Sequence, residues 1–545
     1  MHLFRKLLAP TIVVLAGATG SCPGARALPS PPTLGGHPIR LDAAHKLLSW
    51  WTGDAPFAHV AGLAWHAMET RFPPQDNGIE TWLSNSRFDP DTCSGINWPH
   101  NPAGLYAMLT DSAVLWYEFS GDRAAIDVVR KALDYQIAHG TTPASWDWAR
   151  VPYASANAGD LDYAGADDSW CNACGRGDGT GVIEPDKVGE LGFAYMQMYE
   201  LTGDARYRAE AQACADALAE HVREGDDQRS PWPFRVYAQS GVAREEYSAN
   251  VVGALMLFDE LERLSIGDVA DYHHARTVAR DWLLRVPLKN DAWSGYFEDI
   301  DIQTDPGFNT NQYAPMRTAR WLLQHRDEDP DWHDHVTHLI GWVAQTFGGD
   351  TAREAGLQWG ARVISEQIDD VVKMGSHTAR FGATNALWFA ATGDAVARER
   401  AMRSLNWSTY ACAQDGIVAV GDDPNEGWWF SDGYGDYIRH FMVAMAAVPQ
   451  WAPRHENHLL ESTSIVTHVD YGNPSQIAWS TFDADSTETL RLRAPPTQVT
   501  VRGKKLPEAT GLEGPGYTVH LLPLGDAVVR IRHEVGGPVV VAARP

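Results

Sequence analysis

Six segments of this 545-residue chain combine carboxylates, amides and aromatic side chains. They are 97–100, 178–187, 231–235 with 244–247, 293–299 with 309–313, 358–378 and 426–437, and each precedes an apolar, helix-like stretch. Aromatic rings stack on the flat apolar face of a sugar, and neighbouring carboxylates and amides bond its hydroxyl groups. The composition of the six segments therefore predicts a cleft suited to a carbohydrate.

Two carboxyl groups can hydrolyse a glycosidic bond when one acts as the acid and the other as the base or nucleophile. Glu184 and Glu366 are the candidates for the general acid, because aromatic or apolar neighbours along the chain would raise the pKa of each. Asp370 and Asp432 are the candidates for the partner. Asp432 also stands at a predicted helix start, where an acid can simply stabilise the helix dipole.

Elimination at a uronate is the alternative chemistry, and it commonly uses a histidine and a tyrosine as base and acid. His377 and Tyr434 fit that pair. A helix start disfavours protonated His377, which suits a neutral base, although a lone histidine at a helix start is more often a hydrogen-bonded structural residue. The surplus of carboxylates favours hydrolysis, and a non-catalytic glycan-binding protein is the third interpretation.

The predicted sugar contacts are aromatic, amide and charged side chains of the same segments. They are Trp98, Trp232, Arg235, Glu246, Tyr247, Asn311, Tyr313, Trp359, Trp428, Trp429 and Tyr437. We predict no cofactor and no catalytic metal. An acidic loop, 160–178, offers carboxylates for a structural calcium ion, but its spacing differs from the twelve-residue calcium loop and favours a solvated loop.

A repeated turn positions these segments. Four tripeptides end in Gly-Asp, at 120–122, 202–204, 266–268 and 392–394. Glycine can end a helix in the left-handed conformation, and the aspartate after it can cap the next helix. Gly203, Gly267 and Gly393 are 64 and 126 residues apart, so the repeat is about 63 residues long and a further turn falls at 327–330.

The repeat predicts helical hairpins whose first helices are apolar on most sides and whose second helices are more charged, as in an inner and an outer ring. The pairs are 101–120 with 122–138, 185–202 with 204–223, 245–266 with 268–286, 311–325 with 330–347 and 377–392 with 394–410, followed by 432–447 alone. A helix within 41–71 can supply the sixth partner and close the ring. We therefore expect a mainly α fold, an (α/α)6 toroid, in preference to an open solenoid.

Both ends of the chain differ from this repeat. Short β-rich runs separated by turns fill the last segment, which predicts a small C-terminal antiparallel β-sandwich. The first residues combine Arg5 and Lys6 with an apolar run and a small-residue cleavage site at 25–27. The predicted organisation is a signal peptide at 1–27, the toroid at 28–455 and the sandwich at 456–545, in a secreted or periplasmic protein. A lipid anchor at Cys22 is less favoured, because Thr19 stands at the position where such sites usually have a bulky aliphatic residue.

The net charge of −26 argues against nucleic acid and anionic membranes as partners, and no stretch is long enough to span a bilayer. An oligo- or polysaccharide is the expected partner. In an oxidising compartment, a disulfide among Cys93, Cys171 and Cys174 is plausible, whereas one Cys-x-x-Cys pair is too few ligands for zinc.

The repeat, the placement of the loops and their aromatic content resemble the six-hairpin glycosidase-like group over residues 41–545. That group includes glycoside hydrolases and polysaccharide lyases built on an (α/α)6 toroid, often with a β-sandwich. The resemblance implies a carbohydrate-active enzyme. It carries no family-specific catalytic motif, so it assigns no residue its role.

Overall fold

The computed structural model describes residues 33–543 apart from 76, 170–174, 298–309, 349–356, 369–370, 420–427 and 430–433. The signal peptide predicted at 1–27, together with Cys171 and Cys174, lies outside the described residues, so these stay predictions. Cys93 is a buried free thiol. No helix of the described part is long and apolar enough to cross a membrane.

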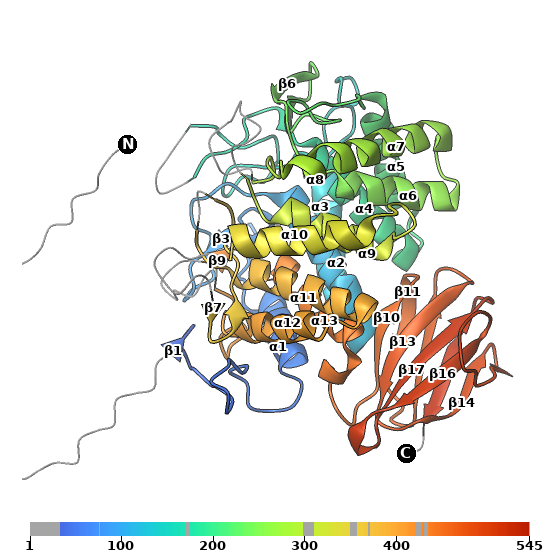
Figure 1. The fold of residues 1–545 in the computed structure, drawn as a ribbon. Helices are drawn as coiled ribbons and strands as arrows, with labels where there is room; N and C mark the ends of the chain where they lie inside the picture. Colours follow the sequence, from blue (N-terminus) through green and yellow to red (C-terminus); the bar gives the residue numbers. More distant parts are fainter. Residues whose placement is uncertain are drawn as a thin grey trace, which may run out of the picture. The chain divides into compact units, whose positions relative to one another are not determined.

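Six inner helices form a closed ring. Figure 1 shows the helices from the side, with the C-terminal strands at the lower right. The inner helices are α2 (Pro102–Ser120), α4 (Pro185–Thr202), α6 (Val252–Leu264), α9 (Tyr313–Gln324), α11 (Gly375–Thr392) and α13 (Asp436–Ala447). Each contacts the next in this order, and α13 contacts α2. The predicted toroid is therefore confirmed, and an open solenoid is wrong.

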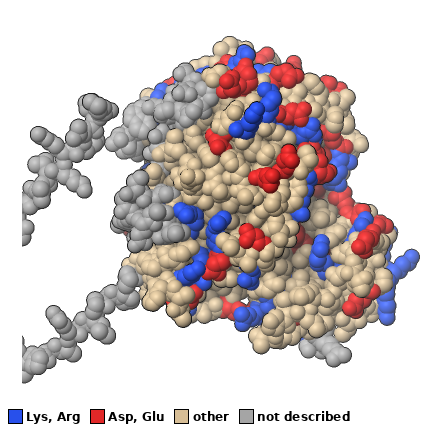
Figure 2. Space-filling model, in the orientation of Figure 1, with Lys and Arg blue, Asp and Glu red and all other residues tan. Residues whose placement is uncertain are grey.

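The outer helices are α3 (Arg123–His139), α5 (Ala205–Glu220), α7 (Val269–Arg285), α10 (Trp332–Thr346) and α12 (Ala395–Thr409), completed by α1 (Pro56–Thr70). Because α1 contacts α13, α12 and α3, it is the sixth partner expected from 41–71. A short helix, α8 (Pro287–Asn290), follows α7. Acidic and basic side chains are intermixed on the visible face of the molecule (Figure 2).

The Gly-Asp turns behave as predicted, except that α6 ends in the left-handed conformation at Ser265 rather than at Gly267. Gly121, Gly203 and Gly393 end α2, α4 and α11 with φ of 77°, 72° and 78°. Asp122, Asp204, Asp268 and Asp394 each accept a main-chain N–H of the helix that follows. These side chains satisfy donors that a helix start otherwise leaves without partners.

One predicted boundary is wrong: the third inner helix begins at Val252 rather than near Glu245. Val242–Glu245 instead forms strand β6. Beyond it, the main-chain N–H of Asn250 donates to Ser248 Oγ at 3.2 Å. Such a local bond offers the backbone an alternative to the helix, which starts only afterwards.

The C-terminal strands form two antiparallel sheets, a β-sandwich as predicted. One sheet has the order β10 (His458–Ser462), β13 (Ser486–Leu492), β17 (Ala527–His533), β16 (Gly516–Leu521). The other has the order β11 (Val466–Asp470), β12 (Gln476–Thr481), β18 (Val539–Ala543), β14 (Pro496–Val501), β15 (Lys504–Lys505). Sequence patterns missed β10, β12 and β15.

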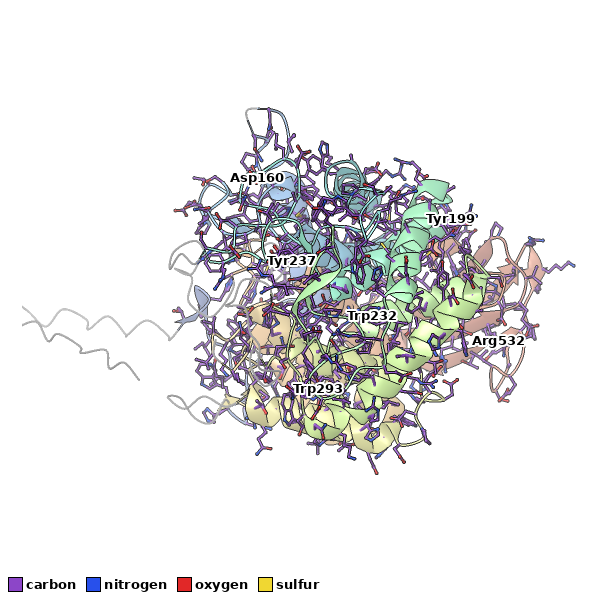
Figure 3. The ribbon with its side chains drawn as sticks, turned by 90° about the horizontal axis from the view of Figure 1, so that it is seen from above. Asp160, Tyr199, Trp232, Tyr237, Trp293 and Arg532 are labelled. Atoms are coloured by element: carbon purple, nitrogen blue, oxygen red, sulfur yellow. The ribbon has the colours of Figure 1, made fainter. Side chains whose placement is uncertain are left out.

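The sandwich packs on the pole of the toroid where the inner helices end. Phe119 of α2 stacks on His458 at 4.1 Å, and Tyr199 of α4 meets Phe482 at 6.0 Å between ring centres. Arg263 of α6 pairs with Asp483 at 2.6 Å. Figure 3 shows Tyr199 beside the sandwich, with Tyr237 and Trp293 of the loops farther from it. The loops that begin the inner helices are therefore left at the other pole.

Candidate functional site

Loops of adjacent hairpins pair with one another at the free pole, which we call the loop pole (Figure 1). Before α2 and α13, β3 (Arg87–Phe88) pairs with β9 (Trp428–Trp429). Before α4 and α6, β4 (Val182–Ile183) pairs with β5 (Arg235–Tyr237), which pairs with β6. Before α9 and α11, Asn311 bridges Gln367. These pairings hold the starts of the six inner helices together.

A buried charged cluster surrounds His377 at the start of α11. The Arg380 guanidinium donates to His377 Nδ1 at 3.1 Å and to Gln312 Oε1 at 2.8 Å, and it also pairs with Asp436. Burial and the neighbouring Arg380 hold the pKa of His377 well below its usual range. The ring is therefore neutral, and because arginine only donates, Nδ1 accepts and the proton sits on Nε2.

Asp436, in the first turn of α13, neutralises this cluster. Burial alone would raise the pKa of its carboxyl, but Arg380 and Arg439 outweigh burial and hold it well below the usual range. His440 Nε2 also lies 3.1 Å from Asp436 Oδ1. Burial lowers the pKa of His440 to about 3 despite that carboxylate, so this ring is neutral too.

A carboxylate pair stands on the first two turns of α4. Asp186 and Glu190 are four residues apart, so they share one face of the helix. The Asn250 amide nitrogen donates to both, at 3.0 Å to Asp186 Oδ2 and 3.1 Å to Glu190 Oε1. Lys187 Nζ donates to Asp186 Oδ2 at 3.0 Å, and the Tyr313 hydroxyl donates to Glu190 Oε1 at 2.9 Å.

Aromatic side chains join the two polar groups. Met108, Tyr296, Phe297 and Tyr313 form an apolar cluster separate from the main core. The rings of Tyr296 and Tyr313 stack at 3.7 Å between centres. Lys187 Nζ lies 4.0 Å from the centre of the Tyr296 ring, and the Arg380 guanidinium lies 4.4 Å from that of Tyr313. These contacts place cations against aromatic faces and fix both rings.

Besides Arg380 Nε, four buried polar atoms of this region have no hydrogen-bond partner within the described part of the chain. They are Glu190 Oε2, Asn250 Oδ1, Gln312 Nε2 and His377 Nε2. Their side chains are at most 3 % exposed. Folded proteins rarely leave such atoms unpaired, because the loss of hydration is not compensated. Two donors and two acceptors gathered here suit water molecules or the hydroxyl groups of a ligand.

A cavity on the toroid axis adjoins this region, lined in part by Asp111, Glu190, Tyr313, Arg317 and Arg439. It has about 40 Å³ of room for the centres of water molecules. One water molecule needs roughly 10–15 Å³ on that measure, so the cavity holds a few of them. It is smaller than the sugar-sized cleft that the loop composition predicts.

No protein-family model matches this chain, and no curated protein matches it either. Among solved structures, cellobiose 2-epimerase from Spirochaeta thermophila matches with a TM-score of 0.52 at 11 % identity, over 72 % of this chain and 96 % of that enzyme. The chain has the fold of the six-hairpin glycosidase-like enzymes. A D-mannose isomerase matches with a TM-score of 0.50 and 11 % identity, over 72 % and 97 % of the two chains.

Several predicted site residues serve as packing and hydrogen-bonding parts of this six-hairpin fold. Four are buried and donate to main-chain carbonyl groups: Trp232 to Leu218, Tyr247 to Ala292, Asn311 to Trp293 and Tyr437 to Ser408. Tyr434 is buried against Phe72, with ring centres 5.5 Å apart. These contacts indicate that the side chains stabilise the fold. Tyr313, in contrast, lies in the candidate site.

Glu184, predicted as a general acid, is fully buried in an ion-pair network. Its carboxylate lies 3.1 Å from Arg235 Nε and 3.4 Å from Lys187 Nζ. Arg235 also meets Glu245 at 2.8 Å, so the network ties β5 and β6 to the start of α4. Two buried cations already contact this carboxylate, which favours a structural role in the network over contact with a substrate.

The other predicted residues are more accessible or lie outside the described part. Trp98 is half-buried with the Arg87 guanidinium 4.9 Å from its ring, and Glu246 is exposed and pairs with Arg223 at 2.6 Å. Trp359 is 36 % exposed, and half-buried Glu366 precedes α11. Asp370 and Asp432 lie outside the described residues, and only the backbone of Trp428 and Trp429 is described. The roles of all these residues stay predictions.

The acidic loop shows no metal cluster: nowhere in the described part do three metal-ligating side chains gather. Asp168 pairs with Arg244, Asp178 with Ser155, and Asp162 with His139.

The sequence interpretation missed Glu190 and Asn250, and it did not select Asp186 or Asp436 for chemistry. One signal was present: Lys187 and Glu190 interrupt an inner helix that is otherwise apolar on most sides, as Arg439 and His440 interrupt α13. Charged residues on a buried ring face must be paired or functional, because an unpaired buried charge is costly.

Proposed function

We propose that the protein is a carbohydrate-active enzyme, a glycoside hydrolase, whose site lies among the inner helix starts at the loop pole. The observation that supports this most is the Asp186–Glu190 pair, in which both carboxylates bond the one Asn250 amide. Hydrolysis of a glycosidic bond requires two carboxyl groups close together, one protonated and one ionised. The carboxylates first predicted for these roles are replaced here by this pair.

The two members of the pair have different surroundings. Burial raises the pKa of Asp186 against the opposing charge of Lys187, and Glu190 adds to the rise. Asp186 is therefore assigned the role of proton donor to the leaving oxygen. Glu190 lines the axial cavity and has one oxygen without a partner among the described residues, so it is assigned the role of base or nucleophile. A carboxyl group whose pKa is raised by burial is typical of the proton donor in such a pair.

Neighbouring groups can form hydrogen bonds with the hydroxyl groups of a sugar. Gln312 Nε2 and His377 Nε2 offer hydrogen-bond donors, and Asn250 Oδ1 offers an acceptor. All three lie on segments that begin inner helices, whose N-terminal ends carry partial positive charge. Such an arrangement favours binding of a hydroxyl-rich ligand at this end of the ring.

Elimination with His377 as the base is less well supported. Its Nδ1 lone pair already accepts from Arg380, and Nε2 carries the proton. Neither nitrogen is free to take a proton from a substrate, so His377 suits hydrogen-bond donation instead.

The proposal is tested by incubating the purified protein with a panel of neutral glycans and uronate polymers. New reducing ends without new ultraviolet absorbance of unsaturated uronates are the expected result. New absorbance would overturn hydrolysis in favour of elimination. Conversion of a sugar to an isomer, followed by NMR and without new reducing ends, would also overturn it. Binding without any turnover would support a glycan-binding protein instead.

A further inference from the structure

A second, smaller cavity lies between α9, α11 and α13, and four arginines line it. Arg317 and Arg320 come from α9, Arg380 from α11 and Arg439 from α13. The remaining lining residues are Met316, Ala383, Thr384, Leu387, His440 and Val443. No carboxylate is among them. Since the His440 ring is neutral, every charged group that faces this cavity is a guanidinium.

Two of these arginines have a carboxylate in direct contact, whereas the other two have one only at a longer distance. Asp436 contacts both Arg380 and Arg439. In contrast, the carboxylate nearest to Arg317 is Glu190 at 3.9 Å, and the one nearest to Arg320 is Asp111 at 3.7 Å. Both distances exceed that of a charge-assisted hydrogen bond.

The Arg320 guanidinium makes no hydrogen bond to any described residue. Its nearest carboxylate, Asp111, also pairs with Arg439 at 3.3 Å. Burial and the charges of Arg439 and Arg317 lower the pKa of Arg320, against Asp111. Arg380, only 3 % exposed, also has its Nε–H without an acceptor in the described part of the chain. A buried donor without an acceptor, such as the Arg380 Nε–H, is costly, and a protein interior compensates it with an ion or with water. The Arg320 side chain is 23 % exposed, and its guanidinium borders both cavities.

The count of charges favours an ion over water. Four guanidinium groups meet three carboxylates, Asp111, Glu190 and Asp436, within the described residues. The next carboxylate towards Arg320 is Glu461 of β10, whose pKa burial raises against the charges of Arg530 and Arg320. The centre of the ring is therefore left with excess positive charge.

Size restricts the occupant. The cavity has about 10 Å³ of room for the centre of a water-sized particle. That is roughly the room for one such particle, which excludes a carboxylate-bearing sugar and fits a monatomic anion. Arg317 and Arg320 also line the larger axial cavity, so an ion has space beside the site through which to arrive.

We infer that the cavity between α9, α11 and α13 is a halide-binding site, occupied by chloride under ordinary conditions and held by Arg317 and Arg320. The ion completes the charge balance of the ring interior and links three inner helices. This site is distinct from the Asp186–Glu190 pair, so it does not depend on the proposed reaction.

The test uses the full-length protein in sodium gluconate, titrated with sodium chloride at constant ionic strength. We expect a saturable rise in Tm of about 1–3 °C, because a ligand that binds only the folded state stabilises it. Sodium bromide should act like chloride. An unchanged Tm in both halides would overturn the inference, and so would a rise with acetate but not with halides.

Arg320→Gln removes the guanidinium and should abolish the halide response, while Arg229→Gln, an exposed arginine paired with Asp226, should retain it. Equal responses of the two variants would contradict the assignment of Arg320. If Arg320→Gln does not fold, wild-type crystals grown in bromide decide the question by anomalous diffraction. A bromide peak between Arg317 and Arg320 is expected, and its absence overturns the inference.

Discussion

At the pole where the inner helices end, which we call the turn pole, the chain reverses through short turns, most of them Gly-Asp. At the loop pole it instead passes through long paired segments before each inner helix begins. The turns satisfy their own polar groups, since each aspartate caps the helix that follows it. The loop pole instead leaves Glu190, Asn250, Gln312 and His377 each with an atom lacking a partner among the described residues. Near the Gly-Asp turns, single carboxylate oxygens such as Glu118 Oε1 also lack a partner among the described residues, whereas the loop pole gathers donors and acceptors in one place.

We propose on the basis of this difference that the function belongs to the loop pole. A fold tolerates unsatisfied buried polar groups mainly where something else repays their cost, as at a binding site. The sandwich adds to the asymmetry, because it packs against the ends of α2, α4 and α6. We therefore propose that a substrate binds at the loop pole, and the variants below test that assignment.

The largest effect is expected for the carboxylate pair. Asp186→Asn and Glu190→Gln keep the shape of each side chain and remove its acid or base function. Each should lower kcat about 10²–10⁴-fold, the usual contribution of a positioned acid or base. The measurement is the rate of reducing-end release from the glycan that the panel identifies, with circular dichroism to verify folding. Asp127→Asn, on the exposed side of α3, is the matched control and should retain full activity. Near-normal rates in both site variants would show that the pair is not catalytic.

Asp436→Asn should have the largest effect on stability. The substitution leaves Arg380 and Arg439 buried without their common counterion, which costs about 3–5 kcal/mol of unfolding free energy. Urea denaturation measures the loss. Asp334→Asn is the matched control, because Asp334 also lies in the first turn of a helix but its side chain is 91 % exposed. Similar losses for the two variants would show that only the helix dipole matters.

The turn pole was predictable from sequence and much of the loop pole was not. Gly203 and Asp204 act through bonds between residues a few positions apart, so their pattern alone indicated the hairpin and its period. Closure of the ring by α1 followed from counting helices. The start of α6 was misplaced because the Ser248–Asn250 bond competes with the helix in a way that apolar periodicity does not reveal.

The site could be predicted only as a region. Asn250 bonds Asp186 across 64 positions of the chain, and Arg380 reaches Asp436 across 56. Such contacts depend on which inner helices are neighbours and on which face each residue occupies. Loop composition pointed to the same pole as the proposed site but favoured Trp232 and Tyr437, whose polar atoms bond main-chain carbonyls of the fold. Aromatic content therefore did not separate packing residues from those of the site.

A moderate effect is expected at the turn pole. Asp394→Ala removes the side chain that accepts the Val396 N–H at 2.8 Å, and it should lower the free energy of unfolding by about 1 kcal/mol. Activity should not change, since the turn lies at the other end of the ring. Urea denaturation and the reducing-end assay check the two statements. A clear loss of activity together with an intact fold would contradict the claim that this turn affects stability alone.

The smallest effect is expected from Glu69, the penultimate residue of α1, beside Asp122 at the turn pole. Burial, together with the charge of Asp122 and a hydrogen bond to it, raises the pKa of Glu69 from 4.5 to about 7. The folded state thus disfavours the ionised form. Below pH 4.5 the Glu69 carboxyl is neutral in both the folded and the unfolded state, so it costs no stability. As the pH rises through about 7, ionisation favours the unfolded state and the free energy of unfolding falls. Glu69→Gln should match wild type near pH 4.5 and exceed its stability near pH 8, as measured by urea denaturation at both pH values. Glu220→Gln, at the exposed end of α5, should show no such pH-dependent gain. A gain of Glu69→Gln that is equal at both pH values would contradict the raised pKa and indicate a packing effect instead.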